Sequence, residues 1–301
     1  MAAENGKKKI VTMNIPTKKL KTGFSMPVFG IGTWQMGGRY ERDFSNNDKA
    51  DIDTIKSAIE LGVIHIDTAE VYANGYAETL VGKAIKKYNR KKLFIVSKVL
   101  DENLSYNNVI KSCKKSLKRL KTDYLDLYLA HRYNPKINLE ETIKAMDELL
   151  KLGLIRNIGV SNFTWQHLKD AQSFSKNKIV CNQVHYNLMF REPEKTDLLD
   201  FCQKNDVFLV AWRPIGKGDL LKKIPTILKE ICDKYKKTPA QVAINWLISQ
   251  PYVLTLAKTS NINHLKENLG GIGWEMNKKD IEKLRTNFPG QKYISDTVAL
   301  G

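Results

Sequence analysis

Short apolar segments rich in β-branched residues recur eight times along the chain, and amphipathic segments with helical periodicity lie between them. Near-continuous apolar runs are typical of strands that are buried on both faces, and strands that alternate with helices indicate parallel βαβ units. Eight such units in succession predict an α/β fold in which the sheet closes into a (β/α)8 TIM barrel. The apolar runs begin at Phe29, Ile64, Leu93, Leu125, Ile155, Val180, Val207 and Val253.

An open, doubly wound sheet is the structural alternative. Such a sheet usually carries a G-x-G-x-x-G turn after its first strand. Here Gly30 and Gly32 have no third glycine at the required spacing, and no helix follows them immediately. The strand count and this missing motif favour the barrel. The predicted helices cover Ala50–Leu61, Glu78–Tyr88, Val109–Leu120, Leu139–Leu152, Trp165–Phe174, Leu198–Gln203, Ala240–Ile248 and His264–Leu269, with an extra one over Thr226–Tyr235.

Two further elements flank the predicted barrel. Met13–Lys19 and Met26–Gly30 lie on either side of a turn and predict an N-terminal β-hairpin that closes the bottom of the barrel. Lys278–Phe288 predicts an additional C-terminal helix. Because no linker divides the chain, we expect residues 1–301 to form a single domain, with the barrel proper at about residues 29–270.

The charge balance is strongly basic. The sequence has 49 Lys and Arg against 32 Asp and Glu, a formal net charge of +17. Lysines are scattered along the chain, and the densest runs, such as Lys7–Lys9 and Lys114–Arg119, lie at a terminus or in predicted outer helices. This distribution favours a solvated surface over a nucleic-acid groove, so we expect no nucleic-acid partner. A nucleic-acid-binding protein is the alternative that the charge leaves open.

Cysteine and histidine spacing gives no sign of a disulfide framework or a metal site. The four cysteines include no Cys-x-x-Cys pair, and the five histidines include no His-x-His pair. We therefore expect no metal and a reduced, cytoplasmic protein. No apolar run approaches the roughly 20 residues of a membrane span. Met1–Ile10 lacks the apolar core of a signal peptide, so no membrane association is expected.

Polar residues follow six of the apolar runs at the points where the predicted strands end. In a (β/α)8 barrel the carboxyl ends of the strands meet at one face, and that face carries the active site. A single polar strand end is usually a solvated terminus, whereas six together indicate a functional site. The residues are Asp67, Ser97, Lys98, His131, Arg132, Ser161, Asn162, Asn182, Gln183, Lys258, Thr259 and Ser260.

Short motifs accompany these strand ends. They are Gly32-Thr33-Trp34, Asp67-Thr68-Ala69-x-x-Tyr72, Ser97-Lys98, His131, Gly159-Val160-Ser161-Asn162-Phe163, Asn182-Gln183, Lys258-Thr259 and Glu267-Asn268. In this order they resemble the motifs of the aldo-keto reductases from about Met26 to Asn268, nearly the whole predicted barrel. The resemblance implies an oxidoreductase that reduces aldehydes and ketones to alcohols with NADPH. It also implies a catalytic set of Asp67, Tyr72, Lys98 and His131, and all four are present.

The chemistry of these four residues suits carbonyl reduction. Hydride addition to a carbonyl leaves an alkoxide that needs a proton, and Tyr72 is the expected donor. A neighbouring Lys98 ammonium would favour the phenolate and lower the Tyr72 pKa, while Asp67 would keep Lys98 charged and oriented. His131 would hydrogen-bond the carbonyl oxygen and fix its approach.

The resemblance also implies a cofactor site. Ser161, Asn162 and Gln183 match positions that bind the carboxamide of the nicotinamide ring. Trp212 stands where the family commonly has a tyrosine that stacks on this ring, and the Gly216–Gly218 loop suits the pyrophosphate. The full set expected to contact the cofactor is Thr33, Trp34, Asp67, Ser161, Asn162, Gln183, Trp212, Arg213, Pro214, Ile215, Gly216, Lys217, Gly218, Lys258, Thr259, Ser260, His264, Glu267 and Asn268.

The residues expected to bind the adenosine end of the cofactor bear on the choice between NADPH and NADH. The segment Lys258–Ser260 matches the part of the family that receives the 2′-phosphate of NADPH, and Glu267 and Asn268 match its adenine contacts. His264 stands where the family commonly has an arginine, and histidine lacks the planar guanidinium fork that pairs with a phosphate. We therefore expect NADPH as the cofactor, with NADH possible at a lower preference.

Trp34, Tyr72, His131 and Arg132 are expected to line the substrate pocket for a small-molecule carbonyl. Arg132 stands where many relatives carry tryptophan, and its charge would favour a polar or anionic group on the substrate. The main functional alternative is a catalytically slow, NADPH-binding regulatory subunit of the reductase type. A monomer or a small homo-oligomer is expected.

Overall fold

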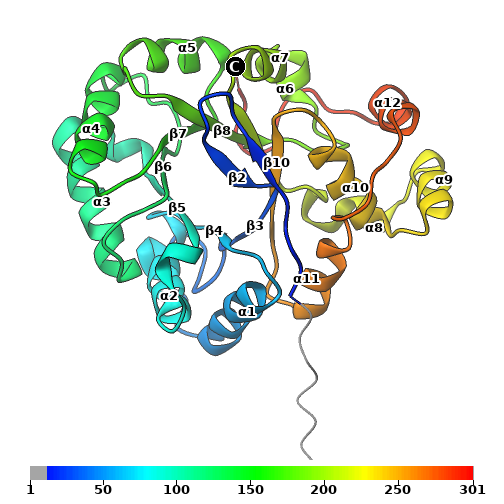
Figure 1. Ribbon diagram of the computed structural model, residues 1–301, viewed down its shortest axis with the longest axis horizontal. Helices are drawn as coiled ribbons and strands as arrows, with labels where there is room; N and C mark the ends of the chain where they lie inside the picture. The colour runs from blue at the N-terminus through cyan, green and yellow to red at the C-terminus, as the bar shows by residue number, and fades with distance from the viewer. Residues whose placement is uncertain (1–11, 301) are drawn as a thin grey trace, which may run out of the picture.

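The computed structural model describes residues 12–300, so the expectations for Met1–Ile10 and Lys7–Lys9 lie outside the described residues. Eight parallel strands close into a barrel in the order β10-β3-β4-β5-β6-β7-β8-β9 (Figure 1). The predicted (β/α)8 fold is therefore confirmed. The strands are β3 (Phe29–Gly32), β4 (His65–Asp67), β5 (Phe94–Val99), β6 (Leu127–Ala130), β7 (Ile158–Ser161), β8 (Ile179–His185), β9 (Phe208–Trp212) and β10 (Val253–Lys258).

Helices surround the barrel, as Figure 1 shows. Their amphipathic sequences explain this layer: α3 (Tyr106–Leu120) buries Val109, Cys113 and Leu117, while Lys111 is exposed. The other helices are α1 (Asp48–Glu60), α2 (Tyr76–Ile85), α4 (Leu139–Lys151), α5 (Trp165–Ser173), α6 (Glu192–Lys195), α7 (Leu198–Lys204), α8 (Asp219–Lys222), α9 (Thr226–Tyr235), α10 (Pro239–Ile248), α11 (Ile262–Leu269) and α12 (Lys278–Asn287), together with the 3-10 turns η1 (Tyr72–Gly75), η2 (Arg90–Lys92), η3 (Asp101–Asn103) and η4 (Gly216–Gly218).

Most helix boundaries lie close to those expected, and capping explains some of the differences. α1 begins two residues earlier than predicted because the Asn47 side chain accepts a hydrogen bond from the Ala50 N–H. The extra helix α9 has the predicted bounds, and the C-terminal α12 ends one residue earlier than predicted, at Asn287. None of the helices within residues 12–300 has the length and apolarity needed to span a lipid bilayer.

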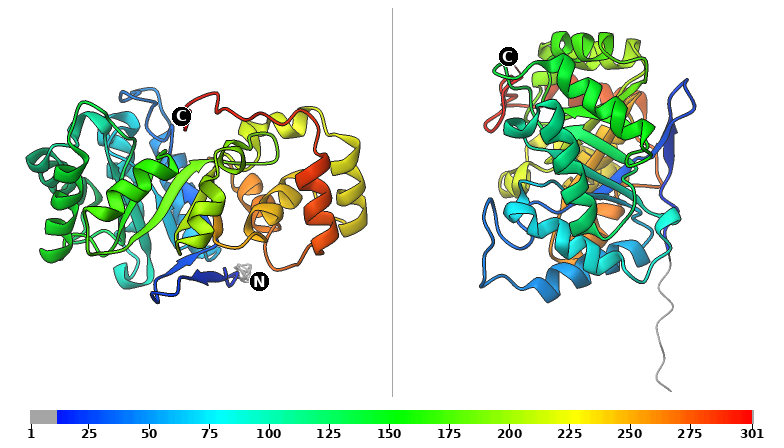
Figure 2. Two further views of the ribbon diagram at one scale, coloured as in Figure 1. Left: turned by 90° about the horizontal axis from the view of Figure 1, so that it is seen from above. Right: turned by 90° about the vertical axis from the view of Figure 1, so that its left-hand side faces the viewer.

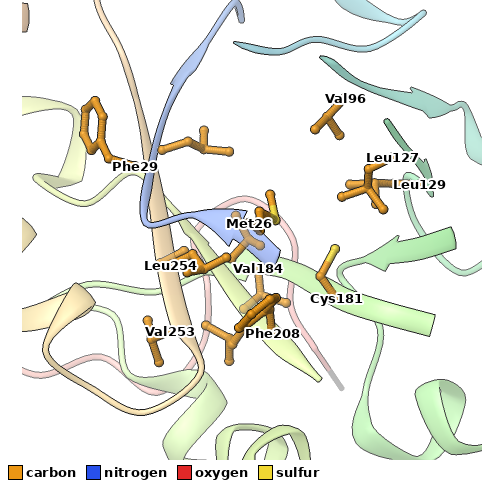
Figure 3. Close-up of a cluster of buried hydrophobic side chains, with 14 of the residues drawn as sticks. Met26, Phe29, Val96, Leu127, Leu129, Cys181, Val184, Phe208, Val253 and Leu254 are labelled. Atoms are coloured by element: carbon orange, nitrogen blue, oxygen red, sulfur yellow. The ribbon is translucent and has the colours of Figure 1, made fainter. Parts of the chain in front are cut away.

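The apolar core fills the barrel interior and the layer between strands and helices. Every residue of β8 is buried, which explains why its sequence reads as an almost continuous apolar run. Figure 3 shows part of this core, with side chains drawn from several strands and from the hairpin. The residues labelled there are Met26, Phe29, Val96, Leu127, Leu129, Cys181, Val184, Phe208, Val253 and Leu254.

The predicted N-terminal hairpin is present and closes one end of the barrel. β1 (Thr17–Lys19) and β2 (Ser25–Pro27) pair in antiparallel register. Phe24, in the turn between them, lies between two barrel strands: its ring centroid is 6.2 Å from that of Phe94 in β5 and 6.1 Å from that of Phe208 in β9. Both partners stand at the amino-terminal starts of their strands. The hairpin therefore plugs the amino-terminal end of the barrel, as expected.

A lysine fastens the hairpin to the barrel. Lys18 Nζ donates hydrogen bonds to the carbonyl oxygens of Ile248, Gln250 and Val253, at 2.6, 2.6 and 2.8 Å. These carbonyls belong to the end of α10, to the connection that follows it and to the first residue of β10. Figure 2 shows the hairpin on one side of the barrel and the C-terminal tail, residues 288–300, on the opposite side. The hairpin thus closes the amino-terminal end of the barrel, and the carboxyl ends of the strands, at the other end, remain available for a functional site.

Candidate active site

The carboxyl ends of β4 and β5 place a buried ion pair at the mouth of the barrel. Asp67 is the last residue of β4, and Lys98 lies near the end of the neighbouring β5. Lys98 Nζ is 2.6 Å from Asp67 Oδ1, and both side chains are at most 2% exposed. Thr33 Oγ1 donates to the Asp67 carbonyl at 3.0 Å and so ties the end of β3 to the pair. Each charge needs the other, because an unpaired charge at this depth would be strongly disfavoured.

Two more side chains extend this pair into a hydrogen-bonded chain. Gln183 Nε2, from β8, donates to Asp67 Oδ2 at 2.9 Å. Lys98 Nζ donates to the Thr68 carbonyl at 2.8 Å and lies 3.5 Å from the Tyr72 hydroxyl. A carboxylate, an ammonium and a phenol are thus brought together in that order. The sequence predicted this grouping, although not the contact between Gln183 and Asp67.

Tyr72, in the turn η1, has a pKa above the ordinary tyrosine value. Burial is the largest cause, because a low-dielectric environment disfavours the phenolate. The Lys98 ammonium acts in the expected, opposite direction but does not outweigh burial, so the expected lowering of the Tyr72 pKa was wrong as a net effect. Tyr72 is therefore a protonated phenol at neutral pH, with an O–H that can be donated.

His131 follows β6 and lies beside Tyr72, with ring centroids 5.9 Å apart. Burial is the main cause that holds its pKa well below the ordinary histidine value, and the charges of Lys98 and Arg132 act in the same direction. The ring is therefore neutral at pH 7. Within residues 12–300, its Nδ1 has no hydrogen-bond partner, and no group of three or more His, Cys, Asp or Glu side chains could hold a metal ion.

Trp34 and Arg132 adjoin this pair of rings. The Trp34 ring centroid is 5.0 Å from that of Tyr72 and 5.2 Å from that of Tyr40. Arg132 is half-buried, and its charge opposes the effect of burial on the Tyr72 pKa and adds to that effect on the His131 pKa. The four residues expected to line the substrate pocket are therefore neighbours in the structure.

The end of β7 carries a hydrogen-bonded group that reaches both the catalytic candidates and β8. Ser161 Oγ donates to the Gln183 carbonyl at 2.8 Å. Asn162 has a left-handed backbone with φ of 58°, a conformation that asparagine tolerates better than most residues. Its Nδ2 donates to the His131 carbonyl at 3.0 Å and to Ser161 Oγ at 2.9 Å. The Asn162 Oδ1 acceptor is buried and has no partner within residues 12–300. An acceptor of this kind fits the NH2 group of a carboxamide.

The end of β9 presents the aromatic ring expected beneath the nicotinamide. Trp212 is half-buried and is the last residue of that strand. It is followed by Arg213 and by the buried Pro214, and then by Ile215 and the turn η4. The three residues of that turn, Gly216, Lys217 and Gly218, all have left-handed backbones, with φ of 57°, 60° and 90°. A glycine adopts this conformation without strain, whereas Lys217 does so at a cost.

The sequence did not reveal the residues that hold this segment. Arg213 Nη1 donates to Thr297 Oγ1 at 2.6 Å and to Asp296 Oδ1 at 3.2 Å, both in the C-terminal tail. The Trp212 ring stacks on His185, the last residue of β8. One signal was available for His185: it stands two residues after Gln183 on the same strand, so both side chains point to the same face. The tail has no periodic pattern and gave no signal.

The end of β10 leads into α11 through the segment expected at the adenosine phosphate. Lys258 Nζ lies 3.2 Å from Ser260 Oγ, and Asn261 caps the helix by accepting from the Asn263 N–H. His264 lies exposed in the first turn of α11. A helix amino terminus beside a lysine favours anions. Thr259 lies in this connection, and the remaining expected residues, Glu267 and Asn268, lie further along α11.

Comparisons with known proteins agree with this geometry. The sequence model described as "Aldo/keto reductase family" matches residues 28–286. The chain is 36% identical over 274 residues to "Methylglyoxal reductase YeaE" of Escherichia coli (strain K12), which covers 89% of this chain and 93% of that protein. It is 44% identical to the thermostable aldo-keto reductase Tm1743, solved with the inhibitor epalrestat, with a TM-score of 0.87 and coverage of 90% and 98%. It is 31% identical to an aldo-keto reductase from Klebsiella pneumoniae solved with NADPH, with a TM-score of 0.81 and coverage of 95% and 99%. The chain belongs to the aldo/keto reductase family.

Proposed function

We propose that this protein reduces aldehydes and ketones to alcohols with NADPH. The observation that carries the proposal is the buried chain of Asp67, Lys98 and Tyr72, which ends in a phenol beside the neutral ring of His131. A carbonyl oxygen between that phenol and that ring would meet two groups able to hydrogen-bond it. The family assignment and the NADPH complex of the Klebsiella relative support the same class of reaction.

Tyr72 is the proposed proton donor. A bound nicotinamide cofactor supplies a hydride to the carbonyl carbon, which leaves negative charge on the carbonyl oxygen. The Tyr72 O–H gives its proton to that oxygen, so that the alcohol is completed and a phenolate remains. The Lys98 ammonium stabilises this phenolate. Burial disfavours the ammonium, but Asp67 and Tyr72 raise the Lys98 pKa overall, so Lys98 stays charged.

His131 is proposed to orient the substrate. Because its ring is neutral, it carries one N–H donor that can hold the carbonyl oxygen near the Tyr72 hydroxyl. The His131 main-chain carbonyl accepts a hydrogen bond from Asn162, which is one of the residues proposed to bind the nicotinamide carboxamide. His131 is therefore linked directly to the proposed carboxamide site. This arrangement would keep the carbonyl and the nicotinamide in one fixed relation, which favours hydride transfer.

Ser161, Asn162 and Gln183 are proposed to bind the carboxamide. The unpaired Asn162 Oδ1 supports this role, because the carboxamide NH2 is the donor that it lacks. Gln183 Nε2 is committed to Asp67, which leaves its Oε1 to accept. Trp212 would stack on the ring, and Gly216, Lys217 and Gly218 would cover the pyrophosphate.

NADPH is the proposed cofactor, with weaker use of NADH. Lys258 and the hydroxyl of Ser260 would receive the 2′-phosphate next to the first turn of α11. Desolvation lowers the Lys258 pKa, and a bound phosphate would act in the opposite direction by favouring the ammonium. His264 is exposed and supplies a weaker partner than the arginine common in the family.

Small carbonyl compounds are the proposed substrates, since the Escherichia coli relative is named a methylglyoxal reductase. Arg132 would favour those with an anionic group, because its half-buried guanidinium directly follows His131 in the chain and can pair with such a group. The Arg132→Ala variant should therefore lose preference for carboxylate-bearing aldehydes over neutral ones. An unchanged preference would remove Arg132 from the proposal.

Calorimetric titration with NADPH and NADH, followed by an NADPH oxidation assay, tests the proposed function. Suitable substrates are methylglyoxal, 4-nitrobenzaldehyde and 9,10-phenanthrenequinone. We expect tighter binding of NADPH than of NADH and turnover of at least one carbonyl. Binding without turnover of any of the three would favour a regulatory subunit that senses NADPH, and tighter binding of NADH would overturn the roles proposed for Lys258 and His264.

A further inference from the structure

His185 and Trp212 end neighbouring strands and are register partners in the sheet. Their rings are stacked almost in parallel, with centroids 4.3 Å apart and an interplanar angle of 9°. On its other face, His185 stacks on Phe190, with centroids 4.2 Å apart and an angle of 28°. The three rings form one continuous stack. His185 is at its centre and is only 2% exposed, whereas Trp212 is half-buried.

The hydrogen bonds around His185 fix its orientation. Asn187 Oδ1 accepts two backbone N–H groups, at 2.9 and 3.0 Å, so the amide NH2 of Asn187 must point the other way. That NH2 donates to the Arg213 carbonyl at 2.8 Å and to His185 Nε2 at 3.3 Å. His185 Nε2 is therefore the acceptor, and its Nδ1 carries the proton that it donates to Ser295 Oγ at 2.8 Å. The ring cannot rotate without losing both bonds.

The ring of His185 is neutral. Burial is the main cause that lowers its pKa to about 3, and the charge of Arg213 acts in the same direction. A neutral imidazole packs between two aromatic rings as a flat, weakly polar partner. Its role here is therefore one of shape rather than charge.

Ser295 is itself held firmly, because the C-terminal tail is fastened to a buried carboxylate. Glu192 is 3% exposed; its Oε2 accepts from the Ser295 N–H at 2.9 Å, and its Oε1 accepts from the Leu300 N–H at 2.8 Å. The tail also pairs with the segment after β8, where the Arg191 N–H donates to the Lys292 carbonyl at 2.8 Å. A rigid support thus runs from the tail through Ser295 and His185 to the ring of Trp212.

We propose that His185 is a positioning residue that holds the Trp212 indole as a platform for the nicotinamide ring, and that the C-terminal tail fixes His185 through Ser295. This inference rests on the proposed function, in which Trp212 stacks on that ring. Because His185 covers one face of the indole, a second flat ring must use the opposite face. The Arg213 guanidinium also contacts the indole, 4.9 Å from its centroid. Without His185, the half-buried indole would lose its stacked partner and keep only the contact with Arg213, so it could adopt other rotamers. The stacked nicotinamide ring would then lose its fixed distance to the substrate.

The test compares five variants with the wild-type protein: Trp212→Ala, His185→Ala, His185→Phe, Ser295→Ala and, as a matched control, His167→Ala. His167 also stacks on an aromatic ring, with its centroid 3.7 Å from that of Tyr133, but it lies on α5 outside the proposed cofactor site. The measurements are NADPH and NADH dissociation constants by calorimetry, the single-turnover rate of NADPH oxidation with 4-nitrobenzaldehyde, and the melting temperature.

His185→Ala should weaken NADPH binding by about threefold to tenfold, the range expected for one aromatic pair. It should slow the single turnover as well, while the ratio of NADPH to NADH affinity stays unchanged, because the adenosine end is not touched. His185→Phe keeps a flat ring in the stack but loses the hydrogen bond to Ser295, so it should restore both quantities to the level of Ser295→Ala, even if it melts earlier. Ser295→Ala should show the same changes as His185→Ala but smaller, and His167→Ala should match wild type.

The outcomes separate this inference from the proposed function. If the wild-type protein does not bind NADPH, or if Trp212→Ala binds it normally, the proposed role of Trp212 fails. If Trp212→Ala weakens binding while a folded His185→Ala does not, only the role of His185 is overturned. The same holds if His185→Phe behaves like His185→Ala, because the effect would then not come from stacking.

Discussion

The two ends of the barrel are built from the same eight strands but differ in whether their buried polar groups have hydrogen-bond partners. The amino-terminal end, which the hairpin covers, is the closed end, and the carboxyl end is the open end. At the amino-terminal end, the hairpin seats Phe24 between two strands, and Lys18 Nζ donates to three carbonyl oxygens. At the carboxyl end, His131 Nδ1 and Asn162 Oδ1 are buried without partners within residues 12–300. Unpaired buried groups cost free energy, so they are expected where a ligand or substrate supplies the missing bond.

His65, at the closed end, is an exception to this contrast. Both ring nitrogens of His65 are buried without partners within residues 12–300. Burial lowers the His65 pKa to about 4, so the ring is neutral, and it packs edge-on against Phe94 with centroids 5.5 Å apart. A fully buried, uncharged ring that packs against Phe94 behaves as core packing. The comparison therefore teaches that unpaired groups point to a site only where they converge with other polar groups at the mouth.

The largest effect is expected at the open end, from Tyr72→Phe. The substitution removes the proposed proton donor but keeps the ring that contacts Trp34 and His131. The turnover rate for carbonyl reduction should fall by about 10²- to 10⁴-fold, the usual contribution of a general acid, with the melting temperature unchanged. Steady-state NADPH oxidation and thermal melting check this. A rate close to wild type would remove Tyr72 from its proposed role.

At the closed end, Phe24→Ala should affect stability instead of activity. Removing a half-buried ring that touches two strands should lower the free energy of unfolding by about 2 kcal/mol. The KM for NADPH should not change. Urea unfolding measures the first quantity, and Phe44→Ala is the matched control because Phe44 is 90% exposed. A change in KM for NADPH without a change in stability would contradict the separation of the two ends.

A smaller effect is expected within the open end, at the proposed phosphate site. Lys258→Ala should raise the KM for NADPH by about tenfold, since a charge-assisted hydrogen bond contributes about 1.5–3 kcal/mol and this lysine is partly solvated. The KM for NADH should stay the same. Lys144→Ala on α4 is the control for the loss of one positive charge. Equal changes for both cofactors would place the 2′-phosphate elsewhere.

The smallest effect is expected from pH. Burial raises the Tyr72 pKa above its ordinary value of about 10, and His131 stays neutral because its pKa is lowered. In the proposed mechanism the protonated phenol is the form active in reduction, and it is lost only as pH rises through that raised pKa. The kcat/KM for reduction, which reports the free enzyme, should therefore be flat between about pH 7 and 9. An alkaline fall centred in that interval would contradict the pKa direction.

Much of the open end could be predicted from the sequence. Asp67, Lys98 and Ser161 each follow an apolar run, so their positions at the mouth follow from the periodicity of the strands. The hairpin plug was also predictable, because a turn separates two extended segments before the first barrel strand. These features depend on residues that are close in sequence or on a repeated pattern.

The parts that the sequence did not reveal depend on burial and on contacts between distant segments. The net direction of the Tyr72 pKa shift follows from burial, which no motif specifies. The support for Trp212 joins His185 to Ser295, 110 residues later in the chain. The tail around Ser295 has no periodic sequence, and its place is set by hydrogen bonds to Glu192 and Arg213.

The central claim, that the open end transfers hydride from a nicotinamide cofactor to a carbonyl carbon, is tested most directly by isotope labelling. Wild-type protein would reduce 4-nitrobenzaldehyde with NADPH that carries two deuterium atoms at C4 of the nicotinamide, and mass spectrometry would analyse the alcohol. We expect one deuterium atom on the carbinol carbon of each product molecule. An alcohol without deuterium, or tight NADPH binding with no alcohol formed, would contradict the claim.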